Sequence, residues 1–457
     1  GTNTLTVNVK TGIGVPTQTL TDQTIYLYKL FDVTESGTTE SKNYAYTVNT
    51  ETGYKEAIKS AIGTSFSGTT DEEYAAAVLA LKDTEGAVQK FANDFTAEAL
   101  TKNLSATANS GKITEKNKTS YTFNNLAAGY YLVYVTGGKE IQSSLVTVDE
   151  TTTTVNLKTE APSIDKTADK TTVNIGDVVT YTVTGAIPDT TGYAEYVYKI
   201  HDELTKGLDF VNDANGTALE AGATTVNVKV AFKAAGVTDA STAPTTATLD
   251  TANNRKMSLD LSEWVRANQA NKGKEFTVTY YAKVNKAAVV TEKNKAQLEY
   301  GNKPGETTTT TPSEVKTPTY PLDILKVKKD SNPEEILAGA HFTLYASTTE
   351  GTIDESKPIK VKKDEDGKYS YAADQASTDP SVITDMVTVA TKFEGTGYNL
   401  HINGLAAGTY YLKETKAPEG YNKLTDAIKV TITKSTTADE NDWTLTVDKG
   451  TVDGKIV

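Results

Sequence analysis

Residues 156–166 read Asn156-Leu-Lys-Thr-Glu-Ala-Pro-Ser-Ile-Asp-Lys166, and they divide the chain. A threonine-rich run typical of a strand, residues 151–157, ends here, a proline interrupts it, and a second strand-like pattern begins at Ile164. The stretch is therefore predicted to join two β domains. We expect Lys158, which closes the first domain, to be exposed to solvent. We expect Lys166, inside the first strand of the second domain, to point into the core.

Length and composition predict several β domains and exclude some kinds of partner. At 457 residues the chain is too long for one core, and short alternating runs rich in Thr, Val and Tyr predict three mainly β domains. The formal net charge of −13 argues against nucleic acids and anionic membranes as partners. Without cysteine, and with three histidines far apart, we expect neither disulfides, nor a metal site, nor a cofactor. No run is long and apolar enough to span a membrane.

The first domain, residues 1–158, is predicted to be an immunoglobulin-like β sandwich with a helical insert. Residues 2–9 alternate between apolar and polar, and residues 24–28 are also typical of a strand. The alanine-rich segments 54–62 and 71–100 instead have apolar residues at helical spacing. We expect these helices to cover an open edge of a sheet.

Two segments of the first domain occur again near the end of the chain. Residues 121–134 and 402–414 share Leu-Ala-Ala-Gly and then Tyr-Tyr-Leu, and residues 25–28 are echoed in residues 342–345. The repetition predicts that the first and third domains are copies of one sandwich fold.

A middle β sandwich is predicted for residues 159–305. Its strand patterns lie at residues 176–184, 194–201, 225–232, 275–284 and 296–300, and a short helix is expected around Trp264. Residues 306–319 are rich in Pro and Thr, so we expect an extended linker that packs little. The third domain then occupies residues 320–457.

The sequence carries no signature of a common soluble enzyme. It has no phosphate-binding loop, no dinucleotide fingerprint, no Gly-x-Ser-x-Gly and no His-Glu-x-x-His. Carboxylates are plentiful, so a glycosidase with two facing carboxylates stays open, although no pair stands out.

Five segments resemble parts of known Gram-positive surface proteins. Residues 337–345 and 410–421 resemble the collagen-adhesin B-type (CnaB-like) domain, and the second is similar to the E-box of that family. Residues 164–166, 198–208 and 294–302 resemble the pilin middle domain that forms an internal isopeptide bond. The order of the three domains resembles that of the major, backbone subunit of sortase-assembled pili.

The resemblance implies a structural protein, not an enzyme, at the extracellular cell surface in a cell-wall-anchored pilus (fimbrium). Its implied partners are identical subunits in a covalent head-to-tail polymer, a pilus-specific sortase, and tip and base pilins. Lys158 occupies the position of the lysine that links subunits, and the Leu-Pro-x-Thr-Gly sorting motif is not in the printed sequence. The alternative is a cell-wall-anchored adhesin that binds a host matrix protein or glycan through the helical insert.

The chemistry of an internal bond requires particular residue types. A lysine amine attacks only when neutral, and burial lowers the pKa of a lysine while it raises that of a carboxyl group. We expect Lys166 to join Asn294 with loss of ammonia, while Asp202 polarises the amide and carries protons. Asn302 is the alternative partner.

For the third domain the resemblance gives Glu414 the role of the acid. The lysine is open between Lys326, whose register matches the apolar residues before it, and Lys328, whose spacing better matches the family. We favour Lys326 slightly. No asparagine follows Trp443, so we expect this domain to be unlinked.

The first domain is expected to lack an internal bond. When the Tyr-Tyr-Leu runs are aligned, Tyr134 occupies the position of Glu414. A tyrosine cannot act there as the proton-carrying acid, although Lys10 and Asn156 lie on the predicted first and last strands.

Overall fold

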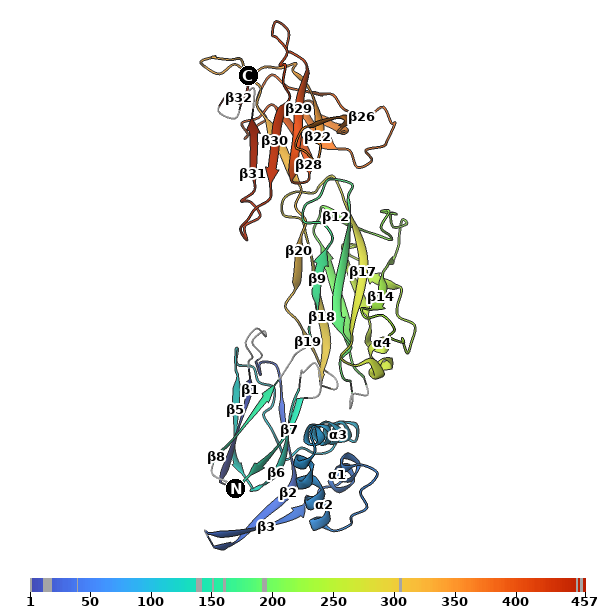
Figure 1. The fold of residues 1–457 in the computed structure, drawn as a ribbon, viewed down its shortest axis with the longest axis vertical. Helices are drawn as coiled ribbons and strands as arrows, with labels where there is room; N and C mark the ends of the chain where they lie inside the picture. Colours follow the sequence, from blue (N-terminus) through green and yellow to red (C-terminus); the bar gives the residue numbers. More distant parts are fainter. Residues whose placement is uncertain are drawn as a thin grey trace.

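The computed structural model describes most of the chain. The described residues are 2–10, 19–38, 40–136, 142–149, 152–158, 162–190, 195–303, 306–448, 451–452 and 455–457. Within them the protein is mainly β, as expected, and its longer helices all lie before residue 102. Three segments follow one another along the long axis, with the N-terminus in the lowest and the C-terminus in the uppermost (Figure 1). No helix among the described residues is long and apolar enough to cross a membrane.

The first segment contains two sheets and the helical insert. Its strands are β1 (Asn3–Lys10), β2 (Ile25–Thr38), β3 (Ser41–Val48), β4 (Ala108–Asn109), β5 (Ser120–Leu126), β6 (Gly129–Val135), β7 (Gln142–Val148) and β8 (Thr152–Lys158). Its helices are α1 (Tyr54–Ile62), α2 (Asp71–Leu79), the 3-10 helix η1 (Ala80–Asp83) and α3 (Ala87–Thr101). One sheet has the order β5-β1-β8, and the other has the order β3-β2-β6-β7 with β4 also paired to β2.

We expected the helices to cover an open edge of a sheet, but they cover a face of the second sheet. Successive side chains of a strand point to opposite faces, and both faces of β2 and β6 are apolar. Leu27 and Val133 pack toward the β5-β1-β8 sheet, whereas Tyr28 and Leu132 pack against the helices, around Phe95. The segment therefore has three layers (Figure 1).

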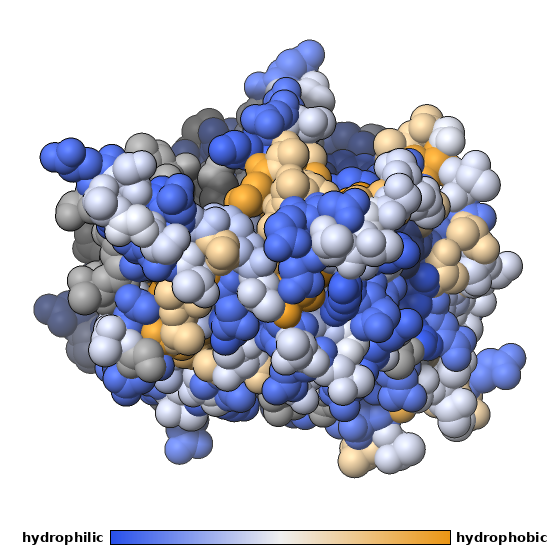
Figure 2. All heavy atoms as spheres, turned by 90° about the horizontal axis from the view of Figure 1, so that it is seen from below, coloured by the Kyte–Doolittle hydropathy of each residue, from blue (hydrophilic) through white to orange (hydrophobic). Residues whose placement is uncertain are grey.

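The outer surface of this end of the molecule is largely hydrophilic. Figure 2, seen from below, shows hydrophobic colours only in small patches separated by hydrophilic residues. The buried residues of α1 and α3, among them Tyr54, Ile58 and Phe91, belong to the core that the helices share with the sheet. The insert thus uses its apolar residues for packing within its own segment.

The middle segment is a sandwich of two sheets with one short helix. Its strands are β9 (Asp165–Ala168), β10 (Val178–Ala186), β11 (Tyr198–Leu204), β12 (Leu208–Val211), β13 (Thr225–Asn227), β14 (Lys229–Phe232), β15 (Thr246–Leu249), β16 (Lys256–Asp260), β17 (Glu275–Val284), β18 (Lys293–Lys303), β19 (Glu306–Thr309) and β20 (Ser313–Lys316). Helix α4 (Ser262–Ala267) contains Trp264, as expected, and the 3-10 helix η2 (Gln269–Asn271) follows it. One sheet has the order β12-β17-β10-β9 with β14 on β17, and the other has the order β13-β15-β16-β11-β18-β19 with β20 on β18.

The expectation of a linker at residues 306–319 is wrong. Within this stretch β19 and β20 both pair antiparallel with β18, so that Glu299 lies opposite Thr309 and Asn294 lies opposite Val315. The physical reason is that threonine is a good strand former, and β18 would otherwise expose an unpaired edge. The Pro/Thr-rich stretch is therefore part of the middle sandwich.

The third segment is a second pair of sheets. Its strands are β21 (Tyr320–Ile324), β22 (His341–Ser347), β23 (Ile353–Pro358), β24 (Val361–Glu365), β25 (Lys368–Tyr371), β26 (Val382–Ile383), β27 (Met386–Val387), β28 (Leu400–Leu405), β29 (Gly408–Lys416), β30 (Ile428–Thr433), β31 (Thr444–Asp448), β32 (Thr451–Val452) and β33 (Lys455–Ile456). The sheets have the orders β21-β28-β25-β24-β26 and β23-β22-β29-β30-β31, with β27 on β22, and β32 pairs with β33. The pairing of β22 with β29 repeats that of β2 with β6, as the internal echo predicted.

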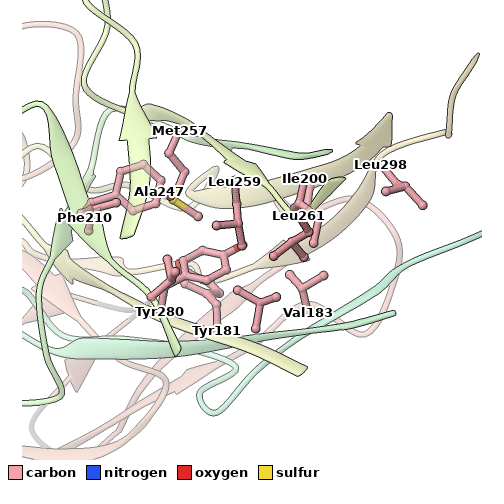
Figure 3. Packing of buried hydrophobic residues seen from close by; sticks show 14 of the residues in the cluster. Tyr181, Val183, Ile200, Phe210, Ala247, Met257, Leu259, Leu261, Tyr280 and Leu298 are labelled. Atoms are coloured by element: carbon pink, nitrogen blue, oxygen red, sulfur yellow. The ribbon is translucent and has the colours of Figure 1, made fainter. Parts of the chain in front are cut away.

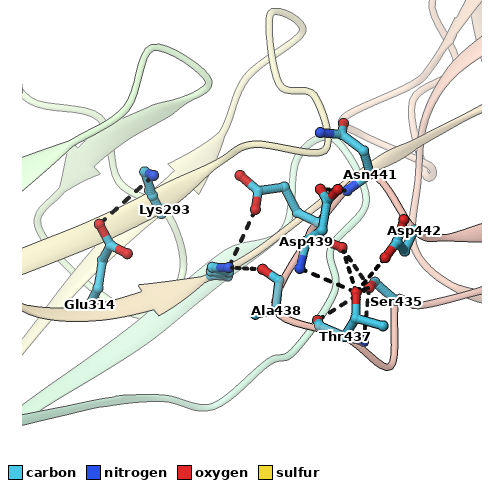
Figure 4. Close-up of polar contacts among 10 residues, drawn as sticks. Lys293, Glu314, Ser435, Thr437, Ala438, Asp439, Asn441 and Asp442 are labelled. Carbon is cyan, nitrogen blue, oxygen red and sulfur yellow. Dashed lines mark hydrogen bonds and ion pairs between the residues drawn. The ribbon is translucent and has the colours of Figure 1, made fainter.

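The middle and third segments meet in a contact that involves backbone on both sides. The N–H of Ile175 donates to the carbonyl oxygen of Gly404 (3.0 Å). Gly404 has a φ of 91°, and a Cβ there would lie 2.2 Å from the Ile175 side chain, so a residue larger than glycine does not fit. On another part of the contact Lys316 Nζ donates to the carbonyl oxygen of Ala438 (2.9 Å) and pairs with Glu440 (3.3 Å) (Figure 4). The two segments are therefore docked against each other.

Candidate functional site

The strand registers bring three of the predicted residues to one place in the middle core. Lys166 lies on β9, opposite Val183 of β10, in one sheet. Asp202 lies on β11 in the facing sheet, and Asn294 lies on the adjacent β18, two residues from the partner of Asp202 in the register. Along β11 every second residue is buried, which turns Asp202 inward. The lysine of one sheet thus faces the carboxyl and amide of the other.

All three side chains are almost completely removed from solvent. The exposed fractions of Lys166, Asp202 and Asn294 are 4%, 3% and 0%. Lys166 Nζ lies 2.9 Å from Asp202 Oδ2, and it also donates to the hydroxyl of Tyr280, which itself donates to the same carboxyl oxygen. Burying a charged side chain costs free energy unless it is paired and hydrogen-bonded. A buried lysine and aspartate at this position therefore suggest a chemical role for the pair.

Aromatic rings enclose the lysine amine. Lys166 Nζ lies 4.3 Å from the ring centroids of both Tyr181 and Tyr280, which are direct partners in the pairing of β10 with β17. Figure 3 shows these two tyrosines in the apolar core of the segment, near Leu259 and Phe210. The surroundings of the amine are therefore poor in water.

This environment shifts the acid–base equilibria of the pair toward the neutral forms. Burial lowers the pKa of Lys166, and the nearby Asp202 opposes that shift only in part. Burial raises the pKa of Asp202 against the opposing effects of Lys166 and of the hydrogen bond from Tyr280. A neutral amine is a nucleophile, and a protonated carboxyl group is a hydrogen-bond donor and a general acid.

Three buried polar atoms without hydrogen-bond partners indicate which group Lys166 and Asp202 can react with. Asp202 Oδ1 and both side-chain polar atoms of Asn294 are buried, and none of them makes a hydrogen bond. Asn294 pairs with Leu204 on β11, so its side chain lies on the same inward face of the sheet as that of Asp202, two residues away along β11. A buried amide without partners is rare and costly in a folded protein. Here it lies beside a lysine and a carboxyl group, which suits an amide that is consumed by reaction.

The backbone register separates the alternative partner, Asn302, from the cluster. Asp202 lies opposite Ala296 on β18. Asn302 is six residues farther along the same strand, or about 20 Å at roughly 3.3 Å per residue. Its side chain lies outside the described residues, but its backbone position is at the far end of β18 from Lys166.

The third segment contains a second buried pair of lysine and carboxylate. Lys326 Nζ lies 3.1 Å from Glu414 Oε2, and the exposed fractions of the two residues are 4% and 1%. The other oxygen of Glu414 accepts a hydrogen bond from the backbone N–H of Leu424 (3.0 Å). Lys328 instead is exposed and lies 3.8 Å from the exposed Glu335. The geometry therefore singles out Lys326 over Lys328.

The described neighbours of Lys326 offer no free amide. Asn399 accepts a hydrogen bond from the backbone N–H of Lys326 (2.9 Å), and it donates to the carbonyl oxygens of Leu337 and Val389. Asn399 is thus fully used in holding the backbone. The residue that pairs with Lys326 on the last described strand is Ile456, which has an apolar side chain.

In the first segment Val135, not Tyr134, occupies the position of Glu414. Ile25 pairs with Val135 in the same way that Phe342 pairs with Glu414. Two equivalent hydrogen bonds support this alignment: the hydroxyl of Tyr131 donates to the carbonyl oxygen of Ala127, and that of Tyr410 donates to the carbonyl oxygen of Ala406, both at 2.7 Å. The Tyr-Tyr-Leu runs are offset by one residue in the structure. Valine, like tyrosine, cannot carry protons for an isopeptide reaction.

Among the other described residues of the first segment there is no such arrangement of a buried lysine, carboxyl group and amide. Asn156 accepts a hydrogen bond from the side chain of Asn8 at the surface (3.2 Å). Lys10 and Lys158 are the last residues of β1 and β8 and pair with each other in the parallel register. The side chains of both lysines lie outside the described residues, so the expected exposure of Lys158 stays a prediction.

Tyr181 and Tyr280, which surround Lys166, are functional residues that we did not predict from the sequence. The sequence does indicate that Tyr280 is buried, because residues 275–284 alternate regularly, and this alternation puts Tyr280 on the same inward face as Phe276 and Val278.

Among the described residues no group of three or more His, Cys, Asp or Glu is placed to hold a metal ion.

Comparisons with known proteins connect the third segment to one family and the whole chain to several solved structures. The family model described as the SpaA prealbumin-like fold domain matches residues 323–446. No curated protein matches the chain. Among solved structures, the T6 backbone pilin of serotype M6 Streptococcus pyogenes is 18% identical, with 96% of this chain and 84% of that chain covered and a TM-score of 0.46.

Two further pilins are similar at the same distant level. The major pilin SpaA of Corynebacterium diphtheriae is 18% identical over 94% of this chain and 95% of that chain, with a TM-score of 0.47. The major pilin subunit BcpA of Bacillus cereus is 15% identical over 94% of this chain and 95% of that chain, with a TM-score of 0.37.

Proposed function

We propose that this chain is the backbone subunit of a covalently polymerised pilus on the surface of a Gram-positive cell, and that its middle domain is closed by an isopeptide bond between Lys166 and Asn294. The observation that carries the proposal is the buried cluster in which the amine of Lys166, the carboxyl group of Asp202 and the unpartnered amide of Asn294 meet. The protein is not an enzyme in the usual sense, since it reacts once and on itself.

The reaction follows from the positions of the groups. After a proton passes from Lys166 to Asp202, the neutral amine attacks Cγ of Asn294 and a new C–N bond forms. The carboxyl group of Asp202 donates to the amide oxygen as negative charge develops there, and one proton passes from the attacking nitrogen to the amide nitrogen, which leaves as ammonia. Held in contact, such groups gain a large effective molarity, so no cofactor is required.

The bond would join the two sheets and shorten the path of a pulling force. Lys166 lies near the start of the middle domain and Asn294 near its end, on strands of opposite sheets. Tension along the chain would then pass from β9 directly into β18 and leave the strands in between unloaded. In a protein without cysteine, this bond takes the place that disulfides have in other extracellular proteins.

Lys158 is the proposed acceptor for the bond between subunits. It is the last residue of β8, at the junction between the first and middle segments. A pilus-specific sortase would join the C-terminal sorting motif of one subunit to this amine, and tip and base pilins would complete a cell-wall-anchored fibre. The match of residues 323–446 to a prealbumin-like domain family agrees with such a subunit.

The proposal can be tested with the chain as an acceptor. The purified protein is incubated with a pilus sortase and a labelled peptide that carries a Leu-Pro-x-Thr-Gly motif, and the label is located by peptide mapping. We expect the label on Lys158 and none on a Lys158→Arg variant. Lys10→Arg, which changes the neighbouring lysine in the register, is the matched control and should be labelled like the wild type. Equal labelling of the Lys158→Arg protein would contradict the assignment.

A further inference from the structure

Tyr280 belongs to the buried cluster through its hydroxyl, but the reaction described above gives it no role. It lies on β17, is fully buried, and belongs to neither of the two strands that would be joined. Its hydroxyl accepts a hydrogen bond from Lys166 Nζ and donates one to Asp202 Oδ2. Together with the direct contact between Lys166 and Asp202, these bonds form a closed ring of three groups.

The ring leaves the two oxygens of Asp202 with different surroundings. Oδ2 is held by both Lys166 and Tyr280, whereas Oδ1 has no hydrogen bond. The amide of Asn294 is also unpartnered, and it lies on the same inward face of the sheet as Asp202, opposite Leu204 of β11. One oxygen is thus anchored, and the other is left for the amide that reacts.

We propose that Tyr280 is a third catalytic residue of isopeptide formation, which carries a proton between the Lys166 amine and Asp202 Oδ2 and keeps Asp202 Oδ1 turned toward Asn294. The proposal rests on the function proposed above. The hydroxyl touches the reacting nitrogen directly, and its two hydrogen bonds run in the direction that a relay from amine to carboxylate requires.

Each proton in this scheme has a defined donor and acceptor. The Lys166 ammonium gives a proton to the Tyr280 oxygen as Tyr280 gives its own proton to Asp202 Oδ2, which leaves a neutral amine, a neutral carboxyl group and an unchanged phenol. The amine then forms a bond to Cγ of Asn294 and the bond from Cγ to the amide nitrogen breaks. The attacking nitrogen then loses one further proton, which reaches the leaving nitrogen through the same groups, so that one ammonia is released and Asp202 keeps the proton that it received first.

The two other buried tyrosines near the site show why the hydroxyl of Tyr280 is special. The Tyr181 ring lies at the same distance from Lys166 Nζ, 4.3 Å, but its hydroxyl hydrogen-bonds neither Lys166 nor Asp202. Tyr198 lies four residues from Asp202 on β11, is also buried, and its hydroxyl has no partner. Tyr198→Phe is therefore a matched control for the loss of a buried hydroxyl from this core.

The test compares the rate of bond formation in the wild type, Tyr280→Phe and Tyr198→Phe. Each full chain is made by cell-free translation, samples are quenched in acid, and the loss of one ammonia is followed by intact mass in the protease-resistant, folded fraction. Because a well-placed proton-transfer group contributes about 10²-fold or more, we expect Tyr280→Phe to link about 10²-fold more slowly. Tyr198→Phe should link at the wild-type rate.

The outcomes separate this inference from the function on which it rests. If the wild type loses no ammonia, the isopeptide proposal itself fails. If the wild type links and Tyr280→Phe links as fast, the bond is established and only the role of Tyr280 is overturned. Equal slowing in Tyr198→Phe would also overturn that role, because the effect would then come from the loss of any buried hydroxyl in this core.

Discussion

Replacement of Asp202 by alanine should prevent the internal bond and destabilise the middle domain. Asp202 is the buried acid beside Lys166, and no other described carboxylate contacts the amine. Without it the amine has no proton acceptor and the amide has no acid to polarise it. We therefore expect Lys166 and Asn294 to stay intact in the Asp202→Ala protein.

The expected loss of stability has two parts. A bond between residues 166 and 294 closes a loop of about 128 residues, and the chain-entropy relation for disulfides gives about 5 kcal/mol for a cross-link of that span. The Lys166 amine would also lose its buried partner, which typically costs about 3–5 kcal/mol. The sum is on the order of 8 kcal/mol, or roughly 25 °C in melting temperature for a segment of about 150 residues.

The assay is thermal unfolding of the full chain by scanning calorimetry, with intact mass measured on the same samples. Glu203→Ala is the matched control, because Glu203 is the next residue on β11 but lies in an exposed pair with Lys295 at 3.6 Å. An exposed pair contributes about 0–1 kcal/mol, so this variant should melt close to the wild type and lack one ammonia as the wild type does. The reasoning is refuted if Asp202→Ala lacks one ammonia, or if it melts within a few degrees of the wild type.

Three further predictions concern the two buried pairs. Glu414→Ala should cost about 3–5 kcal/mol in chemical denaturation because it leaves a buried lysine unpaired, whereas Glu335→Ala, in an exposed pair, should cost less than about 1 kcal/mol; similar losses in both would contradict the burial argument. The wild-type chain should lack one ammonia and not two, and a peptide map that finds Lys326 joined to an asparagine within residues 320–457 would contradict this. In the Asn294→Ala protein Lys166 stays unlinked, and burial lowers the pKa of its amine in the folded state. At pH values between this lowered pKa and the usual lysine pKa of about 10.4, the folded protein therefore binds fewer protons than the unfolded protein. Its unfolding free energy relative to the wild type should therefore rise with pH in this window, and an unchanged difference measured by denaturant titration up to about pH 10 would argue against a free, buried amine.

Much of the architecture could be read from local patterns. Strict alternation located β10 and β17, apolar residues at helical spacing located α1 and α3, and the repeated Leu-Ala-Ala-Gly indicated two related segments. Each of these signals is local, because the side-chain period of a strand or helix is set by its own backbone geometry.

The two wrong expectations, the linker at residues 306–319 and the helices at a sheet edge, concern features that depend on contacts between residues distant in sequence. The Pro/Thr-rich residues 306–319 have the composition of a linker, and they form strands because the edge of β18, which is distant in sequence from most of them, is open for pairing. The helices cover a face because β6 is apolar on both sides. The continuous apolar run at residues 129–135 is typical of a strand that is buried on both faces.

The candidate site, too, could be predicted only in part from the sequence. The motifs contained Lys166, Asp202 and Asn294, and the structure brings them together across two sheets. The choice between Lys326 and Lys328 needed burial, because both have reasonable spacing in the sequence. The contribution of Tyr280 could not be assigned from sequence, since it depends on where a hydroxyl lies relative to two groups on other strands.

The most direct test of the central claim is a peptide map of the wild-type protein around the proposed bond. The account predicts that the proteolytic peptide containing Lys166 is covalently joined to the one containing Asn294, with a combined mass lower than the sum of the two by one ammonia, and that fragmentation places the junction on these two side chains. Recovery of both peptides as separate species at the masses that their sequences require would contradict it.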